Sequence, residues 1–239
     1  MNPPHNKLPQ KSSHSEIDAF LTKVRKTTVM VSNQKRGRLL FALDATASRE
    51  PVWDHACHIQ GQMFDATASL GGLDVQLAYY RGFMEFDAIP WSNSGPNLLS
   101  HMTSIRCAAG QTQIAKVIQH GIMETHKAPI QALIFVGDAM EEDPDALNRL
   151  AGTLGILGVP IMMFQDGFDR IAERAFREIA QLSNGAYCQF DAGSAERLRD
   201  LLCAVAVFAA GGQKALQVFS KTRDPVVAKL TAQLTKARR

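Results

Sequence analysis

Arg38-Leu-Leu-Phe-Ala-Leu-Asp44-Ala-Thr46-Ala-Ser48 is the stretch of the sequence that decides the fold. Residues 38–43 form a short apolar run without alternation, which is typical of a central strand buried on both faces of a sheet. The run stops at Asp44, and Thr46 and Ser48 follow at alternate positions. Alternate residues of an extended segment face the same side. We therefore expect a buried strand that ends in a cluster of three oxygen-bearing side chains.

A second stretch has the same form. Residues 130–136 are another apolar run, which stops at Gly137-Asp138. Between the two runs, Thr112 is expected to open a helix and to bring in a hydroxyl from a neighbouring loop. The combined set has two carboxylates and three hydroxyls, without thiol or imidazole, and such a set suits Mg²⁺ or Mn²⁺ rather than zinc. The candidate metal ligands are Asp44, Thr46, Ser48, Thr112 and Asp138.

The remaining segments predict the fold class. Strands are expected at 73–80, 83–86, 160–164 and 186–190, and helices at 51–70, 96–106, from 112 onward, and at 143–157, 169–182 and 194–210. This alternation predicts an α/β fold with a doubly wound, mostly parallel sheet and helices on both faces. The strand at 83–86 is expected as a short antiparallel edge strand. In such sheets, ligands bind beyond the carboxyl ends of the strands, where the strand order reverses.

The pattern Asp44-x-Thr46-x-Ser48, followed at a distance by Thr112 and Asp138, resembles the metal-ion-dependent adhesion site (MIDAS) of von Willebrand factor A (VWA) domains. The resemblance covers about residues 38–210 and includes the order of strands and helices. The chain departs from the family pattern in two places. Thr46 replaces the usual Ser, and Gly137-Asp138-Ala139 stands where the family has Thr-Asp-Gly. The first change keeps the hydroxyl, whereas the second leaves the conformation of the loop open.

The resemblance implies a mechanism of binding. It implies that Thr46, Ser48 and Thr112 bind the ion directly, and that the two aspartates bind it directly or through water. The cofactor would be Mg²⁺, or alternatively Mn²⁺ or Ca²⁺, and an Asp or Glu of a protein partner would complete its octahedron. Intracellular members of the family act as adaptors, for example beside AAA+ ATPases. An alternative is a structural scaffold with a vestigial metal site, in which the same residues act only as caps and turn residues.

Charge and composition suggest an acidic body with basic ends. Residues 1–38 hold eight Lys/Arg against two Asp/Glu, residues 212–239 hold seven against one, and residues 39–211 hold 11 against 20. We therefore divide the chain into a basic arm with a short helix (1–37), a VWA domain (38–211) and a basic helical tail (212–239). The ends are either solvated arms or docking segments for an acidic surface. They show no interleaved aromatic pattern, so nucleic acid is not expected as a partner.

The cellular setting is expected to be the cytoplasm. The four cysteines are isolated, and buried reduced thiols are typical of that compartment. The first residues lack the apolar stretch of a secretory signal, and the longest apolar run, 201–210, has about half the length of a membrane span. No membrane partner is expected.

Several enzyme classes lack their signatures here. There is no GxxxxGK[ST] loop, no GxGxxG after a strand and no GxSxG elbow. A haloacid-dehalogenase-type phosphatase needs a second Asp where Thr46 stands, and Ser48 has no evident histidine base. We therefore expect a binding protein, with a metal-dependent hydrolase as the weaker reading.

Three further groups of residues remain open at this stage. The acidic run Glu141, Glu142, Asp143 and Asp145 is either a second cation site or a solvated helix start. The pair His55 and His58 is a metal site or a packed or surface pair, and Trp53 and Trp91 lie either near the ion or in the core.

Overall fold

The computed structural model describes residues 36–51, 53, 73–190, 203–207 and 209. The short helix expected in the basic arm, the helical tail expected at 212–239, most of the helices expected at 51–70 and 194–210, and the pair His55 and His58 lie outside the described residues. None of the helices among the described residues is both long and apolar enough to cross a membrane.

The described strands form one sheet in the order β3-β2-β1-β4-β5-β6. All neighbouring strands are parallel except β2 and β3, which are antiparallel. The predicted fold class is therefore confirmed. The bounds of the strands are Gly37–Asp44 (β1), Leu73–Arg81 (β2), Glu85–Ala88 (β3), Ala132–Gly137 (β4), Ile161–Asp166 (β5) and Ala186–Phe190 (β6).

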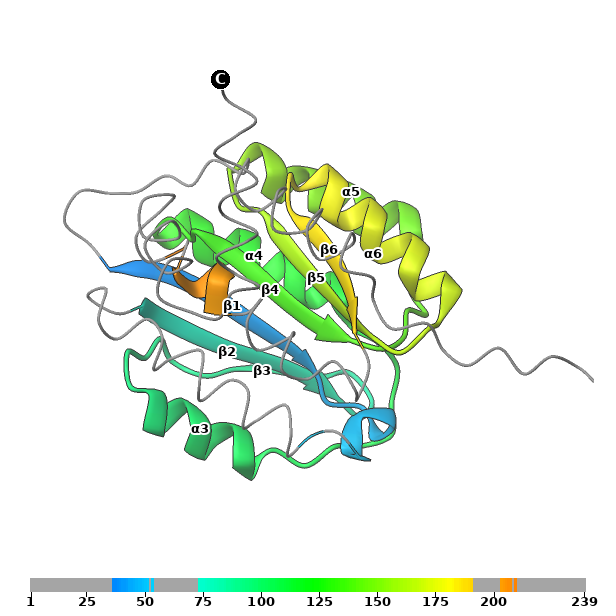
Figure 1. Cartoon of the computed structure of the whole chain (residues 1–239), viewed down its shortest axis with the longest axis horizontal. Coiled ribbons are helices and arrows are strands. Elements are labelled where there is room, and N and C mark those ends of the chain that lie inside the picture. Colours follow the sequence, from blue (N-terminus) through cyan, green and yellow to red (C-terminus); the bar gives the residue numbers. More distant parts are fainter. Residues whose placement is uncertain (1–35, 52, 54–72, 191–202, 208, 210–239) are drawn as a thin grey trace, which may run out of the picture.

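Helices cover both faces of the sheet, as Figure 1 shows. The helices α4, α5 and α6 pack on one face, and α3 packs on the other together with residues 203–207 and 209. Two of the predicted helices begin at aspartate caps: the carboxylates of Asp143 and Asp169 accept hydrogen bonds from backbone N–H groups of the first turn. The bounds are Ala47–Arg49 (η1, a 3₁₀ turn), Gly95–Ser104 (α3), Ile114–Lys127 (α4), Pro144–Ile156 (α5) and Arg170–Leu182 (α6).

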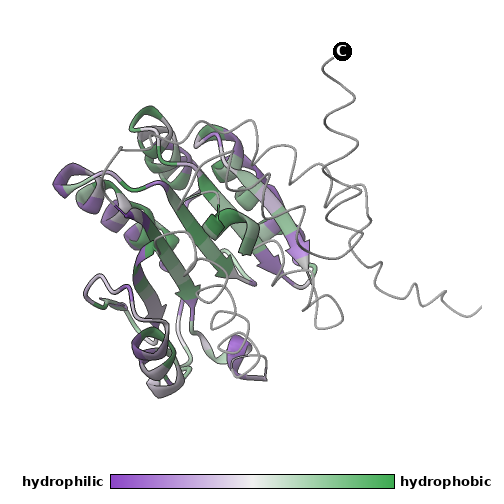
Figure 2. Ribbon diagram, turned by 60° about the vertical axis from the view of Figure 1, so that its left-hand side comes forward, coloured by the Kyte–Doolittle hydropathy of each residue, from purple (hydrophilic) through white to green (hydrophobic). Residues whose placement is uncertain are grey.

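The core consists of two apolar layers, one on each side of the sheet. Alternate residues of β1 point into different layers: Leu39, Phe41 and Leu43 into the layer beneath α3, and Leu40 and Ala42 into the layer beneath α4–α6. Figure 2 shows the central strands as mostly hydrophobic, with hydrophilic residues gathered on the outer helices and loops. This two-sided burial explains why β1 reads as a continuous apolar run.

The edge strand begins two residues later than expected. Residues 82–84 form a tight turn in which Gly82 (φ 55°) and Met84 (φ 60°) have left-handed backbone conformations, so β3 starts at Glu85 instead of residue 83. The helix expected to open at Thr112 likewise begins at Ile114. Thr112 therefore lies in the loop before α4.

The strand order reverses between β1 and β4. The chain leaves β1 toward β2 on one side, and it enters the other half of the sheet at β4. In doubly wound sheets this reversal opens a crevice at the carboxyl ends of the two central strands. Asp44 ends β1, and Asp138 directly follows β4. The fold therefore positions both aspartates at the carboxyl ends of the two central strands, where the strand order reverses.

Candidate metal centre

Asp44 is a fully buried carboxylate held by two donors. Its Oδ1 accepts a hydrogen bond from the backbone N–H of Thr46 at 2.8 Å, and its Oδ2 accepts one from the hydroxyl of Tyr80 at 2.9 Å. The pKa of the Asp44 carboxyl is raised above its ordinary value. Burial is the main cause, the hydrogen bonds from Thr46 and Tyr80 oppose it, and the nearby charge of Asp138 adds to it. The pKa of Tyr80 is itself raised by burial and by the charge of Asp44, so its hydroxyl stays protonated and can donate.

The hydroxyls of Thr46 and Ser48 lie side by side, with Oγ1 and Oγ 3.1 Å apart. Thr46 is buried and Ser48 is exposed. The sequence predicted that the alternate side chains face one way because the loop is extended. In the structure Thr46 is extended (ψ 164°), but the 3₁₀ turn η1 follows it, so a tight turn brings the two hydroxyls together.

Thr112 is fixed to the loop after β4. Its backbone N–H donates to Glu141 Oε2 at 3.2 Å, and its hydroxyl accepts from the backbone N–H of Glu141 at 3.0 Å. Glu141 lies three residues after Asp138. This reciprocal pair joins the loop that carries Thr112 to the loop that carries Asp138, as the candidate site requires.

Asp138 carries the clearest sign of an incomplete site. It is half-buried, and its Oδ1 is buried without a hydrogen-bond partner among the described residues. A Cβ built on the preceding Gly137 would lie 3.4 Å from Cβ of Asp44, which places the two loops side by side. A buried carboxylate next to a second carboxylate, one of whose oxygens is buried without a partner among the described residues, is chemically suited to a divalent cation. The residues present therefore fit a hard, oxygen-bound ion.

The acidic run after Asp138 is occupied by helix capping. Glu142 accepts from the backbone N–H groups of Ile114 and Ala115 at the start of α4, the latter at 2.9 Å, while Asp143 caps α5. Among the described residues, no three or more His, Cys, Asp or Glu side chains gather as a metal would require. The candidate centre therefore rests on two carboxylates and three hydroxyls, and the acidic run supports the helix-start reading.

Sequence reasoning missed two residues near the site. Tyr80 pairs in register with Asp44 across β1 and β2, and only the three-dimensional register reveals this contact. Arg49 follows Ser48, is buried, and forms an ion pair with Asp166 at the end of β5. An arginine directly after the oxygen-rich loop was a visible signal, but its partner lies 117 positions away.

Both tryptophans pack against the rest of the protein and are not exposed beside the candidate centre. Trp53 is buried and donates from Nε1 to the carbonyl oxygen of Met102 at 3.3 Å. Trp91 donates to Glu124, near the end of α4. The core reading of this pair is therefore the one that the structure supports.

Comparison with known proteins identifies the fold. No protein-family model and no curated protein sequence matches the chain. Among solved structures, the chain is similar to the VWA domain of SpRpn10, with a TM-score of 0.57 and 15% identity over 70% of this chain and 94% of that domain. It is also similar to the pilus adhesin SpaC from Lactobacillus rhamnosus GG, with a TM-score of 0.57 and 12% identity over 79% of this chain and 31% of that one.

A third similar structure is proximal thread matrix protein 1 from the mussel byssus, described with a zinc-occupied MIDAS motif. Its TM-score is 0.57, with 15% identity over 74% of this chain and 48% of that one. The chain spans nearly all of the SpRpn10 domain but less than half the length of the other two proteins. At these identities the likeness establishes the fold, and the chain has a VWA-type α/β fold.

Proposed function

We propose that this protein is a protein-interaction module that binds a partner through a divalent cation of the Mg²⁺ type. The ion would be held by Thr46, Ser48 and Thr112 directly, and by Asp44 and Asp138 directly or through water. The observation that carries the proposal is the buried Oδ1 of Asp138, which has no hydrogen-bond partner in the described part of the chain and lies close to the buried carboxylate of Asp44. The VWA-type fold supports it, because such domains are commonly protein-interaction modules.

The residues around the ion have separable tasks. Tyr80 and the backbone of Thr46 orient Asp44, and the Thr112–Glu141 pair joins the two loops that supply ligands. Such positioning lowers the cost of gathering ligands around a small cation that demands regular geometry. When bound, the ion would offer positive charge and a coordination position to an Asp or Glu of the partner. The proposed role is binding rather than catalysis, since the residues that the structure describes supply no general base at the centre beyond the two aspartates.

The partner is proposed to be a protein of an intracellular complex, of which an AAA+ ATPase assembly is one example. A cytoplasmic setting belongs to the same proposal. The sequence supports it, because its four cysteines are isolated from one another, a pattern typical of the reduced thiols of that compartment.

Metal binding is tested by titrating the purified chain with Mg²⁺ and Mn²⁺ in a calorimeter and by measuring thermal unfolding. A ligand at one hundred times its Kd stabilises the folded state by about 2.7 kcal/mol, which for a domain of this size corresponds to roughly 5–10 °C in Tm. Asp44→Asn and Asp138→Asn should lose both the heat and the shift, and the exposed Asp145→Asn should retain them. A wild-type chain without heat or shift would identify a vestigial site and refute the metal-dependent function.

A further inference from the structure

Two large apolar side chains are exposed at the turn between β2 and β3. Phe83 is 81% exposed and Met84 is 64% exposed. Single exposed apolar residues are common on protein surfaces, but neighbouring ones at one site indicate a contact surface.

The turn is held by its surroundings. Lys116 of α4 donates from Nζ to the carbonyl oxygen of Met84 at 2.8 Å, and Gly82 donates from its backbone N–H to the carbonyl oxygen of Ala108 at 3.2 Å. Gln113 Nε2 donates to the carbonyl oxygens of Arg81 and Glu85, each at 3.4 Å. The backbone is thus anchored while the two apolar side chains point into solvent. A turn that is already ordered favours binding, because less conformational entropy is lost when a partner docks.

The turn lies beside the candidate metal centre. Asp44 pairs with Tyr80 in register, so the turn follows directly after the part of β2 that neighbours the centre. A Cβ on Gly110 would lie 1.8 Å from the carbonyl oxygen of Gly82, so the loop that leads to Thr112 rests on the turn. Neighbouring strands are about 4.8 Å apart, and an extended chain advances about 3.3 Å per residue. A partner segment of a few residues can therefore reach from the centre to the turn.

Charges distinguish this side of the centre from the other. Arg106 is exposed and Lys116 is half-buried, and neither forms an ion pair with any residue that the structure describes. Arg81 pairs with Glu85 at 3.0 Å. On the opposite side of the centre, the exposed carboxylates at the start of α5 are Asp143 and Asp145. An acidic segment is therefore attracted toward the turn and repelled from the start of α5.

We propose that Phe83, Met84, Arg106 and Lys116 form a docking corner for a partner segment in which a large apolar residue lies within a few positions of an Asp or Glu. The apolar residue packs on Phe83 and Met84, the acidic residue reaches the metal centre, and further acidic residues face Arg106 and Lys116. This inference rests on the proposed function, because it assigns the partner chemistry of that same site.

The test uses a random peptide library displayed on phage and selected on the full chain in Mg²⁺. Bound phage are eluted first with EDTA and then with acid, and the enriched peptides are synthesised and measured by fluorescence polarisation. The corner variant is Phe83→Ser with Met84→Asn, since Asn tolerates a left-handed backbone at position 84. Its matched control is Ile156→Ser, which removes an apolar side chain that is 90% exposed at the end of α5, on the opposite edge of the sheet. Arg106→Glu tests the charge, with the exposed Arg149→Glu as control.

The expected result is an EDTA-eluted pool rich in peptides that combine an acidic and a large apolar residue. The corner variant should weaken their binding about tenfold and Arg106→Glu about threefold, while both controls stay within twofold. EDTA-eluted peptides that contain acidic residues but no large apolar residue, and that bind the corner variant as well as wild type, would overturn the docking corner. They would leave the proposed metal-dependent function intact. A Phe168→Ser effect larger than that of the corner variant would also overturn it, because Phe168 is exposed on the β5–α6 side. A pool that elutes only with acid would overturn the metal-dependent function itself.

Discussion

At the scale of single residues, the buried carboxylate of Asp44 is stabilised by a hydrogen bond from Tyr80. A carboxylate without exposed surface needs donors, and the Tyr80 hydroxyl is one of those that the described residues supply to Asp44. Tyr80→Phe removes that donor without changing the shape of the ring. We expect the free energy of unfolding of the metal-free protein to fall by about 1–3 kcal/mol, because a buried acceptor loses its partner. Urea denaturation in EDTA measures the change.

The neighbouring tyrosine supplies the control for this variant. The Tyr79 hydroxyl donates to Asp87 Oδ2 at 3.3 Å on an exposed stretch of the sheet. Tyr79→Phe should therefore change the free energy of unfolding by less than about 0.5 kcal/mol, as exposed hydrogen bonds contribute little. Equal losses in the two variants would show that the contact with Asp44 has no special weight.

The residues of the candidate centre differ in how far the sequence could locate them. Asp44 and Asp138 were predicted to follow buried strands, and the structure places them there, because apolar runs that end in a carboxylate identify strand ends. Tyr80 was not found, since its role comes from the pairing of two strands that lie 36 positions apart at this point. That Asp138 Oδ1 is buried without a partner among the described residues is likewise a property of packing and has no local signature.

At the scale of elements, the Arg49–Asp166 ion pair ties the turn after β1 to the end of β5, across β4. Removing one member of a largely buried pair leaves the other charge uncompensated. We expect Arg49→Met to lower the free energy of unfolding by about 3 kcal/mol, with a similar loss for Asp166→Asn. The double variant should lose clearly less than the two single losses combined. A double-mutant cycle from urea denaturation measures this coupling, and strictly additive losses would contradict it.

The sequence located the start of a helix correctly where the capping residue is next to the helix in the chain. The helix start at Asp143 was predicted from residue type and position and is confirmed, and the helix expected from Asp169 begins at Arg170 with Asp169 as its cap. The start of α4 was placed two residues too early because its N–H groups are capped by the distant Glu142 rather than by a neighbouring side chain. The start of β3 was also too early, because anchoring by Lys116 and Gln113 stabilises a turn that includes the left-handed Met84.

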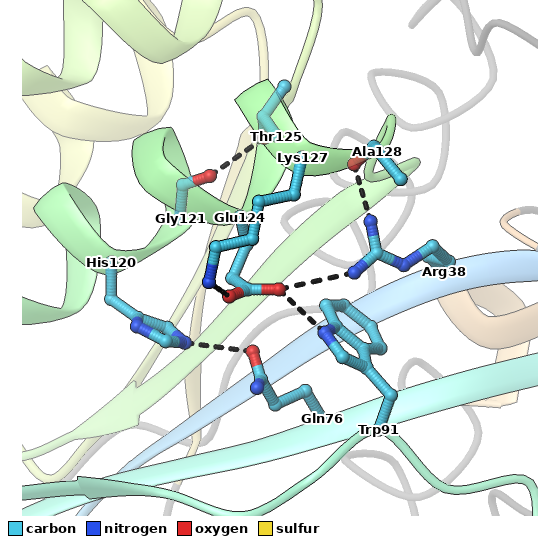
Figure 3. A network of polar contacts seen from close by, with 9 residues as sticks. All are labelled: Arg38, Gln76, Trp91, His120, Gly121, Glu124, Thr125, Lys127 and Ala128. Atoms are coloured by element: carbon cyan, nitrogen blue, oxygen red, sulfur yellow. Dashed lines mark hydrogen bonds and ion pairs between the residues drawn. The ribbon is translucent and has the colours of Figure 1, made fainter.

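At the scale of the whole molecule, the sheet has two edges with different contents. The edge formed by the carboxyl ends of the parallel strands (the carboxyl edge) carries the candidate centre. The edge formed by their amino ends (the amino edge) carries a polar network around Glu124, shown in Figure 3. Glu124 is buried and accepts from Trp91 Nε1 at 2.7 Å, from Arg38 at 3.2 Å and from Lys127 Nζ at 2.6 Å. The Arg38 guanidinium also lies 3.8 Å from the centre of the Trp91 ring. This network fastens the end of α4 to the start of β1.

Glu124→Gln should therefore destabilise the molecule without weakening the binding of Mg²⁺ that we propose at the candidate centre. Charge-assisted hydrogen bonds contribute more than neutral ones, so we expect a loss of about 2 kcal/mol in the free energy of unfolding at pH 7, while the Kd for Mg²⁺ stays within twofold of wild type. Burial works to raise the pKa of the Glu124 carboxyl, but hydrogen bonds from Lys127 and Trp91 and nearby positive charges outweigh it and hold the pKa below its ordinary value of 4.5.

The pH dependence of that loss follows from the direction of the shift. Because the folded pKa lies below the unfolded one, the unfolded chain binds more protons in the interval between them, so the contribution of Glu124 is complete above pH 4.5 and is lost as the pH falls through the folded value. The difference in stability between wild type and Glu124→Gln should therefore be constant from pH 7 to about pH 5 and shrink at lower pH. Denaturation at a series of pH values measures it. A difference that grows on acidification, or a loss of Mg²⁺ affinity as large as that of Asp44→Asn, would contradict the separation of the two edges.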